Sequence, residues 1–429
     1  MPEVGEGRRF LFLQGPHGPF FRQLTNQLEQ SGATCWRVGF NYGDQAFCGH
    51  EHRFIPYHGR PDEWSDTLSF LVAQMEITDI VLYGDVRPVH ASARKLAAKR
   101  NLTLHVFEEG YLRPYWVTYE RGGSNGHSRL MEFSIDDIRA RLGSHQGEQP
   151  EAPATWGDMK HHIFYGAVYH GLVMLGARHF PLFRPHRSLT IRQEFRLHLR
   201  RLALMPFHWI DRVRTTAKVR RGSFPYHLAI LQLEHDSSFT AHSPFSSMTD
   251  FVRTAIKGFS EGAPSHHHLV FKAHPLEDGR TPLKADIRRI AKDHGVEDRV
   301  HFLRGGKLAT LLDTARSAVT INSTAGQQVL WRGKPLKIFG TAVYGRPELV
   351  SGQSLEDFFA APVQPDLAAY HDFRNFLLAT SQIPGGFYSA RGRRRLLRLV
   401  VDKMLDHSDP YDALSLTTNR SPEALEAAQ

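Results

Sequence analysis

The sequence of 429 residues contains only two cysteines, Cys35 and Cys48, and no Cys-x-x-Cys pair. This scarcity excludes a disulfide framework and a thiolate zinc site, and it fits a reducing compartment. The N-terminal segment lacks the apolar core of a signal peptide. The most apolar stretch, residues 163–177, is interrupted by His170 and is shorter than the roughly 20 residues that span a bilayer. We therefore expect neither signal-peptide export nor a transmembrane helix.

Acidic residues are outnumbered by basic ones, with 44 Asp and Glu against 53 Lys and Arg, which gives a formal net charge of +9. The excess favours a partner rich in negative charge, such as a phosphate, a nucleotide or an anionic lipid. The motifs that read nucleic acids are missing, so we expect no nucleic-acid partner. The histidine runs at 50–52 and 266–268 lack the spacing of a closed ligand set, so we expect no metal site.

Hydrophobic residues make up 41% of the chain, enough for two substantial cores. Short apolar segments alternate with helix-compatible ones over residues 9–107 and again over residues 226–339, which is typical of parallel βαβ units. The sequence therefore predicts an α/β fold with two Rossmann-like, doubly wound domains. We expect an N-terminal domain over residues 1–221 with a helical insertion at about 136–221, a C-terminal domain over 222–366, and a helical segment and tail over 367–429.

Two adjacent carboxylates, Glu108 and Glu109, follow a strand predicted over residues 102–107 and precede Gly110. In an open parallel sheet, ligands bind outside the carboxyl ends of the strands. Like-charge repulsion and partial burial would raise the pKa of at least one of these carboxyl groups toward that of a useful base. A solvated acidic turn explains the same residues equally well.

A second strand, predicted over residues 268–272, ends in a cation, an imidazole and a proline at Lys272, His274 and Pro275. Because proline restricts the residue before it, Pro275 fixes where His274 points. A histidine held in this way could hydrogen-bond a phosphate and supply a proton to it. A structural histidine at a strand end is the alternative.

A third strand, predicted over residues 318–321, is followed by small residues that carry hydroxyl groups at the start of a helix. Hydroxyls, backbone amides and the helix dipole together make a phosphate site, although capping of the helix also explains Ser or Thr here. The residues concerned are Ser323, Thr324, Ala325 and Gly326.

The loop at residues 14–19 follows the first strand and is expected to face a cleft between the domains, although it matches neither a dinucleotide fingerprint nor a P-loop. An acidic pair in one half and a histidine with hydroxyls in the other predict a composite site for group transfer from an activated phosphate donor. The candidates expected to line the cleft are Gln14, Gly15, His17, Gly18, Gly110 and Arg113.

Residues 107–128, 231–245, 272–275 and 323–345 resemble the capsule-polysaccharide synthesis proteins of the KpsS type, which are related to the KpsC-type β-Kdo transferases. The resemblance extends from about Arg9 to about Asp406. It implies a GT-B-like glycosyltransferase with a central cleft, which moves Kdo from CMP-Kdo to a phosphatidylglycerol-type lipid in the linker of a capsular polysaccharide. It also implies no further cofactor, other capsule-assembly proteins as partners, and a cytoplasmic location, peripheral on the inner face of the cytoplasmic membrane.

The resemblance also implies roles for the motif residues. Glu109 would be the catalytic carboxylate with Glu108 in support, and His274 would act on the leaving phosphate. Where KpsC-like sequences tend to have Glu-Asp-Gly, this chain has Glu-Glu-Gly. Retention of configuration allows a double displacement, with a front-face route as the alternative. Donor binding would fall to Lys272, Pro275, Ser323, Thr324, Ala325 and Gly326.

Aromatic, aliphatic and cationic residues mix over residues 161–187, followed by Arg192, Arg196, Arg200 and Arg201. An amphipathic helix of this composition could rest on an anionic membrane, and a core helix with a solvated basic face explains the pattern equally well. The alternative function is a noncatalytic lipid- or polysaccharide-binding component of capsule assembly and export, which would tolerate loss of the acidic pair.

Overall fold

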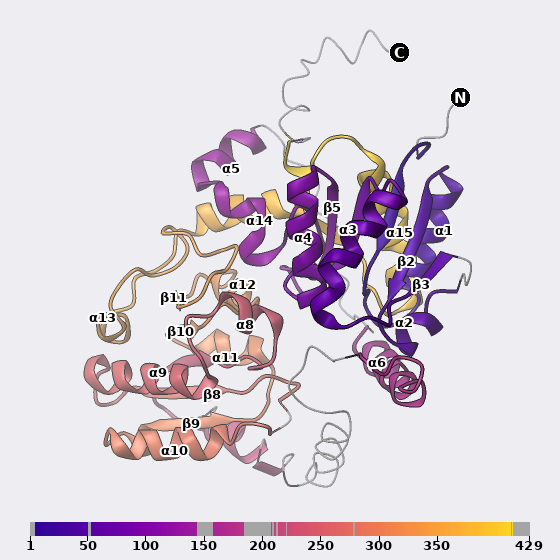
Figure 1. The fold of residues 1–429 in the computed structure, drawn as a ribbon. Coiled ribbons are helices and arrows are strands. Elements are labelled where there is room, and N and C mark those ends of the chain that lie inside the picture. The colour runs from indigo at the N-terminus through magenta and orange to yellow at the C-terminus, as the bar shows by residue number, and fades with distance from the viewer. Residues whose placement is uncertain are drawn as a thin grey trace. The chain divides into compact units, whose positions relative to one another are not determined.

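The computed structural model describes residues 5–49, 53–143, 158–183, 207, 210–211, 213–219, 221–277, 279–412 and 414. The chain divides into two compact units (Figure 1). Unit 1 comprises residues 1–186 and 374–429, and unit 2 comprises residues 187–373. The C-terminal segment, which the sequence left on its own, thus belongs with the N-terminal unit from Arg374 onward. Arg192, Arg196, Arg200 and Arg201 lie outside the described residues.

Unit 1 contains a seven-stranded sheet in the order β3-β2-β1-β4-β5-β6-β12. The strands from β3 to β5 are parallel, and β6 pairs antiparallel with both β5 and β12. The order reverses between β1 and β4, which is the point where doubly wound sheets bind ligands. The strands are β1 (Arg9–Phe12), β2 (Thr34–Gly39), β3 (Phe54–Pro56), β4 (Asp79–Tyr83), β5 (Thr103–Glu109), β6 (Trp116–Arg121) and β12 (Gln382–Pro384).

Helices cover both faces of this sheet because its strands are apolar on both sides. Phe10 and Phe12 of β1 pack in a cluster with α1 and α15, whereas Leu11 and Leu13 pack in a second cluster with α3 and α4. Burying each of these side chains contributes about 1.5–3 kcal/mol. The helices are α1 (Phe20–Gln30), α2 (Tyr42–Ala46), α3 (Trp64–Gln74), α4 (Pro88–Arg100), α5 (Ile135–Leu142), α6 (Asp158–Leu175) and α15 (Ala390–Leu405).

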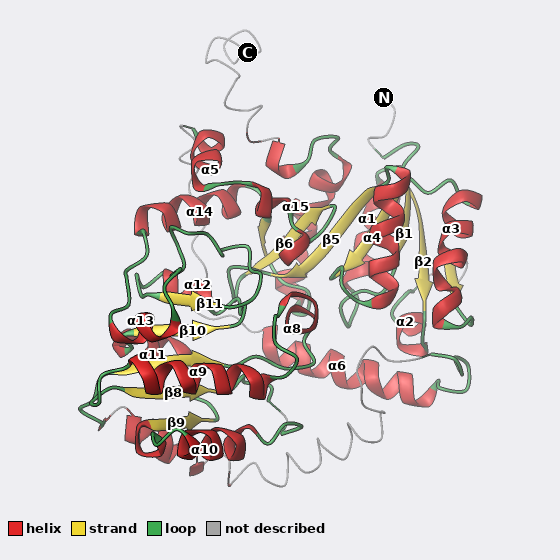
Figure 2. Ribbon diagram, turned by 60° about the vertical axis from the view of Figure 1, so that its left-hand side comes forward, coloured by secondary structure: helices red, strands yellow, loops and turns green. Residues whose placement is uncertain are grey.

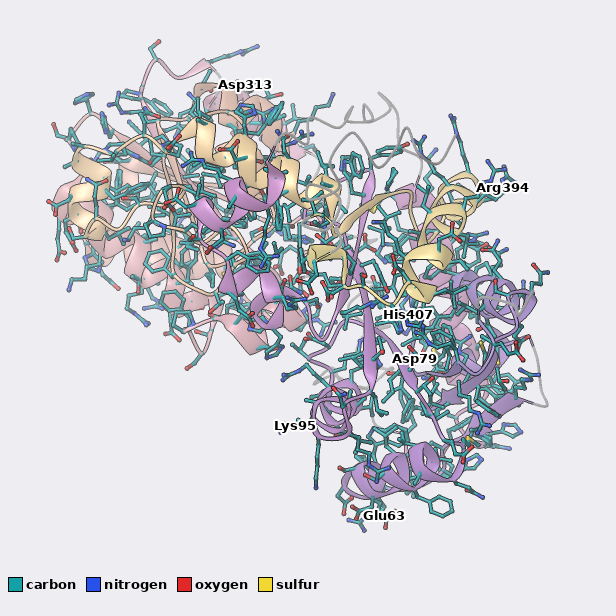
Figure 3. The ribbon with its side chains drawn as sticks, turned by 90° about the horizontal axis from the view of Figure 1, so that it is seen from above. Glu63, Asp79, Lys95, Asp313, Arg394 and His407 are labelled. Carbon is teal, nitrogen blue, oxygen red and sulfur yellow. The ribbon has the colours of Figure 1, made fainter. Side chains whose placement is uncertain are left out.

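Most charged side chains of unit 1 that Figure 3 labels lie on its outside, whereas one lies in its interior. Glu63, Lys95 and Arg394 are exposed on the outside of the unit. Asp79, the first residue of β4, is completely buried and is paired with Arg8 and His105. These hydrogen bonds hold the pKa of Asp79 well below its usual range although burial opposes the shift. Asp79 begins its strand, so this buried network lies at the end of the sheet opposite the ligand-binding edge.

Unit 2 contains a five-stranded parallel sheet in the order β9-β8-β7-β10-β11, which reverses between β7 and β10 (Figure 2). Its strands are β7 (Tyr226–Ile230), β8 (His268–Lys272), β9 (Val300–Leu303), β10 (Ser317–Thr320) and β11 (Leu336–Ile338). Its helices are α8 (Ser237–His242), α9 (Met248–Gly262), α10 (Leu283–Asp293), α11 (Leu308–Thr314), α12 (Gly326–Leu330) and α13 (Leu355–Ala360). Helix α14 (Leu367–Ala379) contains the boundary between the units.

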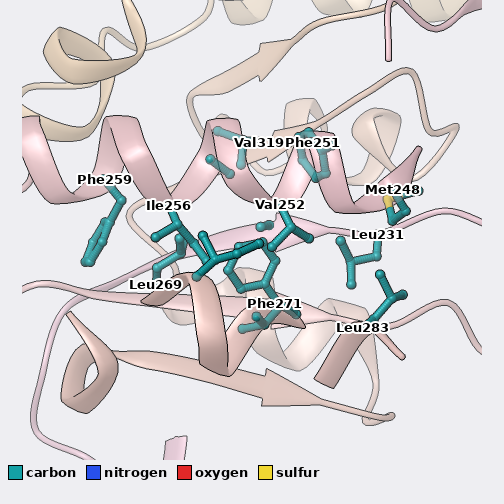
Figure 4. Close-up of a cluster of buried hydrophobic side chains, with 14 of the residues drawn as sticks. Leu231, Met248, Phe251, Val252, Ile256, Phe259, Leu269, Phe271, Leu283 and Val319 are labelled. Carbon is teal, nitrogen blue, oxygen red and sulfur yellow. The ribbon is translucent and has the colours of Figure 1, made fainter. Parts of the chain in front are cut away.

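The core of unit 2 forms between α9 and the sheet (Figure 4). Met248, Phe251, Val252, Ile256 and Phe259 recur at intervals of three and four residues, and all are buried. This spacing puts them on one face of the helix, which packs on apolar side chains of β8. Ser247 caps the helix by accepting a hydrogen bond from the amide of residue 250.

The predicted fold class is confirmed, because both units are Rossmann-like and doubly wound, and two such units are the domain content of the GT-B-like class. The central cleft stays a prediction. The strand at His268–Lys272 begins and ends where the sequence predicts. β5 instead continues to Glu109, and the sequence missed β6 and its antiparallel pairing. Within the described ranges, no helix has the length and apolarity required to cross a bilayer.

Candidate active site

The acidic pair lies at the carboxyl end of β5, next to the point where the sheet order of unit 1 reverses. Glu108 and Glu109 are the last two residues of this strand, opposite Thr118 and Val117 of β6. The expectation that they follow the strand is therefore wrong, because pairing with β6 extends β5 by two residues. Both side chains are half-buried, and the Glu109 amide donates to Glu108 Oε1 at 3.1 Å. The pair is held by a sheet and not by a flexible turn.

The hydroxyl group of Tyr83, the last residue of the neighbouring β4, donates to Glu109 Oε1 at 3.1 Å. Burial raises the pKa of Tyr83 well above its usual value of 10, and the nearby Glu109 charge raises it further. Tyr83 therefore remains a proton donor throughout the physiological range. One oxygen of Glu109 is thus held in place by a hydrogen bond from a neutral donor.

Two glycines leave space around the acidic pair. Gly84 has a φ of +69°, and a Cβ atom there would lie 3.1 Å from Glu108 Oε2. At Gly110 a Cβ atom would lie 2.2 Å from the carbonyl oxygen of Trp116, which the hairpin between β5 and β6 does not permit. Glycine at position 110 is thus required for the turn that ends β5.

A histidine held by an aspartate lies at the same edge of the sheet, and the sequence analysis missed it. Asp85 follows β4 and is 1% exposed, and its Oδ2 lies 2.9 Å from Nδ1 of His127. The amide of Ser124 also donates to Asp85, at 3.2 Å. This pairing puts the His127 proton on Nδ1 and fixes the ring orientation. No local signal reveals it, since the two residues are 42 positions apart.

The loop after β6 is fastened by a completely buried carboxylate, Glu120. It accepts hydrogen bonds from Tyr111 at 2.7 Å, from Ser128 at 2.5 Å and from Tyr411 of the C-terminal segment. Burial raises the pKa of Glu120 to about 7, although these three bonds oppose the shift. The network joins three separate segments around the loop that carries His127.

We expect the stability of unit 1 to depend on pH through Glu120. Its pKa is higher in the folded state than the ordinary value of about 4.5, so the folded state binds the proton more tightly. The protonated Glu120 contributes at most about 3 kcal/mol to the free energy of unfolding. This contribution is fully present below about pH 4.5 and is lost as pH rises through about 7. Urea unfolding of the wild type and Glu120→Gln at several pH values between 5 and 8 measures this. Parallel pH dependences in the two proteins would contradict it.

The loop at residues 14–19 makes its contacts within unit 1. Gln14 is buried and donates to Asp44 Oδ2 at 3.0 Å. His17 stacks on Tyr169 of α6 at 4.4 Å between ring centroids. A Cβ atom on Gly15 or on Gly18 would meet the ring of Phe21 or of Tyr165, respectively. Their place in a cleft stays a prediction, as does that of Arg113, which is exposed and donates to the carbonyl of Gly110 at 3.2 Å.

In unit 2, two buried amide side chains join the strand ends where the sheet order reverses. Gln232, just after β7, donates from Nε2 to Asn322 Oδ1 at 2.8 Å, and the backbone amide of Asn322 donates to Gln232 Oε1 at 3.0 Å. This pair places Ser323 and Thr324 directly beyond the carboxyl end of β10. The motif therefore lies where doubly wound sheets bind ligands.

The small residues after β10 have separate roles in the structure. Ser323 Oγ accepts a hydrogen bond from the amide of Ala325 at 3.2 Å. Gly326 lies under the hydroxyl group of Tyr344, where a Cβ atom would come within 2.4 Å of it. The side-chain amide of Gln327 is buried and has no hydrogen-bond partner among the described residues. An unpaired buried amide costs about 1–3 kcal/mol, so this position calls for a polar partner such as a ligand or water.

His274 follows β8 and is half-buried. Its Nδ1 accepts a hydrogen bond from the backbone amide of Leu276 at 3.1 Å. An accepting Nδ1 carries no proton, so the neutral ring carries its proton on Nε2. His274 is therefore arranged to donate a hydrogen bond through Nε2.

A pocket of about 660 Å³ lies at the carboxyl ends of β8 and β9 and is called the basic pocket here. Three cations, Lys272, Arg304 and Lys307, are among its lining residues, together with Pro275 and Thr216, and the described lining includes no carboxylate. Lys272 is 5% exposed, and burial lowers the pKa of its ammonium group. Such a pocket attracts an anion. Arg304 and Lys307 were missed because nothing in the local sequence connects them with Lys272.

The structure thus places the predicted site residues in two sets. Glu108, Glu109 and Gly110 lie at one strand end of unit 1, and the remaining motif residues lie at strand ends of unit 2, from Lys272 to Pro275 and from Ser323 to Gly326. The composite site between the two domains stays a prediction. In the described part of the chain, no group of three or more His, Cys, Asp or Glu residues could hold a metal ion.

The sequence comparisons all point to capsule polysaccharide proteins. The family described as "Capsule polysaccharide biosynthesis protein" matches residues 78–388. The chain is 32% identical over 386 residues to the capsule polysaccharide export protein KpsS of Escherichia coli, covering 89% of this chain and 97% of that protein. It is 29% identical over 394 residues to the capsule polysaccharide modification protein LipB of Neisseria meningitidis serogroup A, covering 88% of this chain and 91% of that protein. Among solved structures, Thermosulfurimonas dismutans KpsC, a beta Kdo 2,7 transferase, aligns with a TM-score of 0.40 and 11% identity, covering 86% of this chain and 99% of that chain.

Proposed function

Because the chain belongs to the family of capsule polysaccharide biosynthesis proteins, we propose that it is a glycosyltransferase that moves Kdo from CMP-Kdo to a phosphatidylglycerol-type lipid in the linker of a capsular polysaccharide. The donor class rests on the resemblance of the acid-acid-Gly, His-Pro and Ser/Thr motifs to those of enzymes that use CMP-linked acidic sugars. The phosphatidylglycerol-type acceptor rests on the resemblance to the KpsS-type proteins.

The basic pocket of unit 2 is the observation that carries this proposal. It is lined by Lys272 and Pro275 of the His-Pro motif together with Arg304 and Lys307. A nucleoside monophosphate on a sugar acid is anionic at both its phosphate and its carboxylate, which matches a pocket with three cations, of which Arg304 also pairs with Asp211 at 3.6 Å. His274 adds a neutral donor, Nε2–H, at the same strand end.

In the proposed first step, a Glu109 oxygen bonds to the anomeric carbon of Kdo as the bond from that carbon to the phosphate oxygen breaks. The electron pair of the broken bond leaves with CMP. His274 donates a hydrogen bond to the departing phosphate through Nε2, and the hydroxyls of Ser323 and Thr324 hold it, because charge develops there in the transition state. The Tyr83 hydroxyl keeps Glu109 oriented for attack.

In the proposed second step, the acceptor hydroxyl attacks the same carbon and releases Glu109. Glu108 lies at the same strand end, with its side chain directed to the other face of the sheet, and in this proposal it takes the proton of that hydroxyl at the sheet edge and then releases it to solvent. Two displacements at one carbon restore the original configuration, as in retaining glycosidases. Glu109 thus ends the cycle as a free carboxylate.

We further propose that the protein works in the cytoplasm at the inner face of the cytoplasmic membrane, alongside other capsule-assembly proteins. A phosphatidylglycerol-type acceptor has its reacting hydroxyl at the headgroup, so the enzyme must come to the membrane surface. The net charge of +9 favours approach to an anionic leaflet. No bound cofactor takes part in the proposed reaction, so it should continue in excess EDTA.

The direct test is to incubate the purified protein with CMP-Kdo and a short-chain phosphatidylglycerol, and to measure CMP release together with the mass of the lipid product. The proposal expects one CMP for each Kdo added to the lipid. Lipid binding without CMP release would favour the noncatalytic component of capsule assembly instead. Testing CMP-linked sialic acid in parallel distinguishes the Kdo donor from other CMP-linked acidic sugars.

The cations of the basic pocket are expected to act in donor binding. Lys307 is exposed at the pocket, so Lys307→Ala should raise KM for CMP-Kdo by about 3- to 10-fold and change kcat by less than about twofold. Steady-state kinetics at two salt concentrations measures this, and the difference from wild type should shrink at high salt. The matched control is Lys257→Ala, which removes an exposed lysine on α9. An unchanged KM in Lys307→Ala would remove that residue from the donor site.

A further inference from the structure

One side of helix α6 is apolar and exposed to solvent. Six large hydrophobic side chains of this helix have exposed fractions of 36–81%, with Leu175 the most exposed. Singly exposed hydrophobic residues are normal on protein surfaces, but a continuous set on one helix marks a place of contact. This set, called the α6 apolar face, consists of Met159, Ile163, Phe164, Val168, Met174 and Leu175.

The opposite side of α6 is fastened to unit 1, beside α2 (Figures 1 and 2). Tyr169 donates to Asp44 Oδ1 at 2.9 Å, and the ring of His162 stacks on Tyr388 at 4.3 Å. Val173 is buried. Because these contacts hold one side of the helix, they fix which side faces away from the unit.

The charges near this face are mostly positive. Asp158 is the first residue of α6, and residues 159–183 after it contain no Asp or Glu, whereas the exposed cations Lys160 and Arg178 lie near the two ends of the helix. At 1.5 Å per residue, the 18 residues of α6 extend about 27 Å. The face is thus apolar along its length, with one exposed cation near each end.

We propose that the α6 apolar face docks in the interfacial layer of an anionic lipid bilayer, with the helix lying in the membrane plane. Apolar side chains on one side of a helix, flanked by Lys and Arg, are the properties that hold an amphipathic helix at the headgroup boundary. The helix is fastened along its other side and cannot cross the bilayer. The exposed apolar side chains of α6 favour the membrane-bound helix over the core helix, the two interpretations that the sequence left open for this segment.

A second copy of the chain is a poorer occupant of the same face. Two α6 helices packed face to face would bring Lys160 and Arg178 against the same cations of the partner, whether they ran parallel or antiparallel. Asp158 is the one carboxylate of α6, and residues 159–183 offer no other to neutralise these cations. Phospholipid headgroups supply that negative charge. This inference rests on the membrane location proposed above and names the surface that makes the contact, and its test needs neither donor nor turnover.

The experiment is vesicle flotation with the full chain and no CMP-Kdo. Wild type is expected to bind vesicles of phosphatidylcholine with 30% phosphatidylglycerol, and to bind pure phosphatidylcholine at least about tenfold more weakly. Ile163→Glu/Leu175→Glu should weaken binding to the anionic vesicles by about tenfold or more, because two carboxylates replace apolar side chains at the interface. Its rate of transfer to a water-soluble short-chain acceptor should stay near that of wild type.

The matched control is Phe70→Glu/Leu399→Glu, which makes the same charge change at exposed apolar positions on α3 and α15. It should bind anionic vesicles as wild type does. Equal loss in both double variants, or no loss in Ile163→Glu/Leu175→Glu, would overturn the proposal. Failure of wild type to float would overturn it without any variant. A wild-type dimer that Ile163→Glu/Leu175→Glu dissociates, with no vesicle binding, would identify a second copy as the occupant instead.

Discussion

Replacing Glu109 by Gln is expected to lower the rate of CMP release from CMP-Kdo in the presence of acceptor by about 1,000-fold or more. Glutamine has nearly the shape of glutamate but no charged oxygen, so it cannot form the bond to the anomeric carbon. Its carbonyl oxygen can still accept the hydrogen bond from Tyr83. The loss should therefore be chemical, with the thermal midpoint close to that of wild type, which circular dichroism measures.

Two further variants make the Glu109 result specific. Glu108→Gln should lower the rate by about 100-fold, less than Glu109→Gln does, because its proposed task is only to accept a proton. Glu132→Gln removes an exposed carboxylate of the same unit and should remain fully active. Wild-type turnover in Glu109→Gln would assign the nucleophile elsewhere or favour a front-face route. Full turnover in both variants of the pair would place the catalytic carboxylate outside the acidic pair.

Replacing His274 by Ala is expected to lower kcat by about 100-fold, the usual cost of removing a hydrogen-bond donor from charge that develops in a transition state. The geometry makes a finer prediction. Nδ1 of His274 accepts from the amide of Leu276, which leaves Nε2–H as the donor. An asparagine can accept and donate in the same manner, so His274→Asn should recover part of the lost activity.

The control for His274 is His294→Ala, which removes an exposed histidine at the end of α10 and should leave kcat unchanged. If His274→Ala raised KM for CMP-Kdo without lowering kcat, the residue would bind the donor without stabilising its departure. Equal activity in His274→Ala and wild type would leave only a structural role at the strand end. We expect His274→Asn and His274→Ala to have equal thermal midpoints but different kcat values. A folding defect would not produce this difference.

Some site residues can be predicted from the local sequence, and others cannot. Glu108, Glu109 and His274 could be found because unusual side chains stand beside Gly or Pro where an apolar strand ends. Asp85 and His127 could not, since only the folded chain brings them to 2.9 Å. Arg304 and Lys307 likewise join Lys272 only through the parallel pairing of β8 with β9.

Glu120 shows why a charged residue within a strand is a poor guide to whether that position is exposed. A glutamate in the stretch from Trp116 to Arg121 suggests an exposed edge, and so nothing in the local sequence predicts β6 or a buried carboxylate there. Its partners come from three segments, and Tyr411 is 291 residues away. Burial of a charged side chain is tolerated only where hydrogen bonds from distant parts of the chain converge on it. Such convergence has no local signature.

The sequence by itself determined the alternation of strands and helices, the two doubly wound units and the positions of the motifs at strand ends. These follow from local periodicity and from residues that end strands, which act over a few positions along the chain. Only the tertiary structure decided which polar side chains are buried, which nitrogen of His274 or His127 carries the proton, and which side of α6 faces outward. Each of these depends on atoms that are near in space but distant in sequence, because burial and hydrogen bonding are set by neighbours through space.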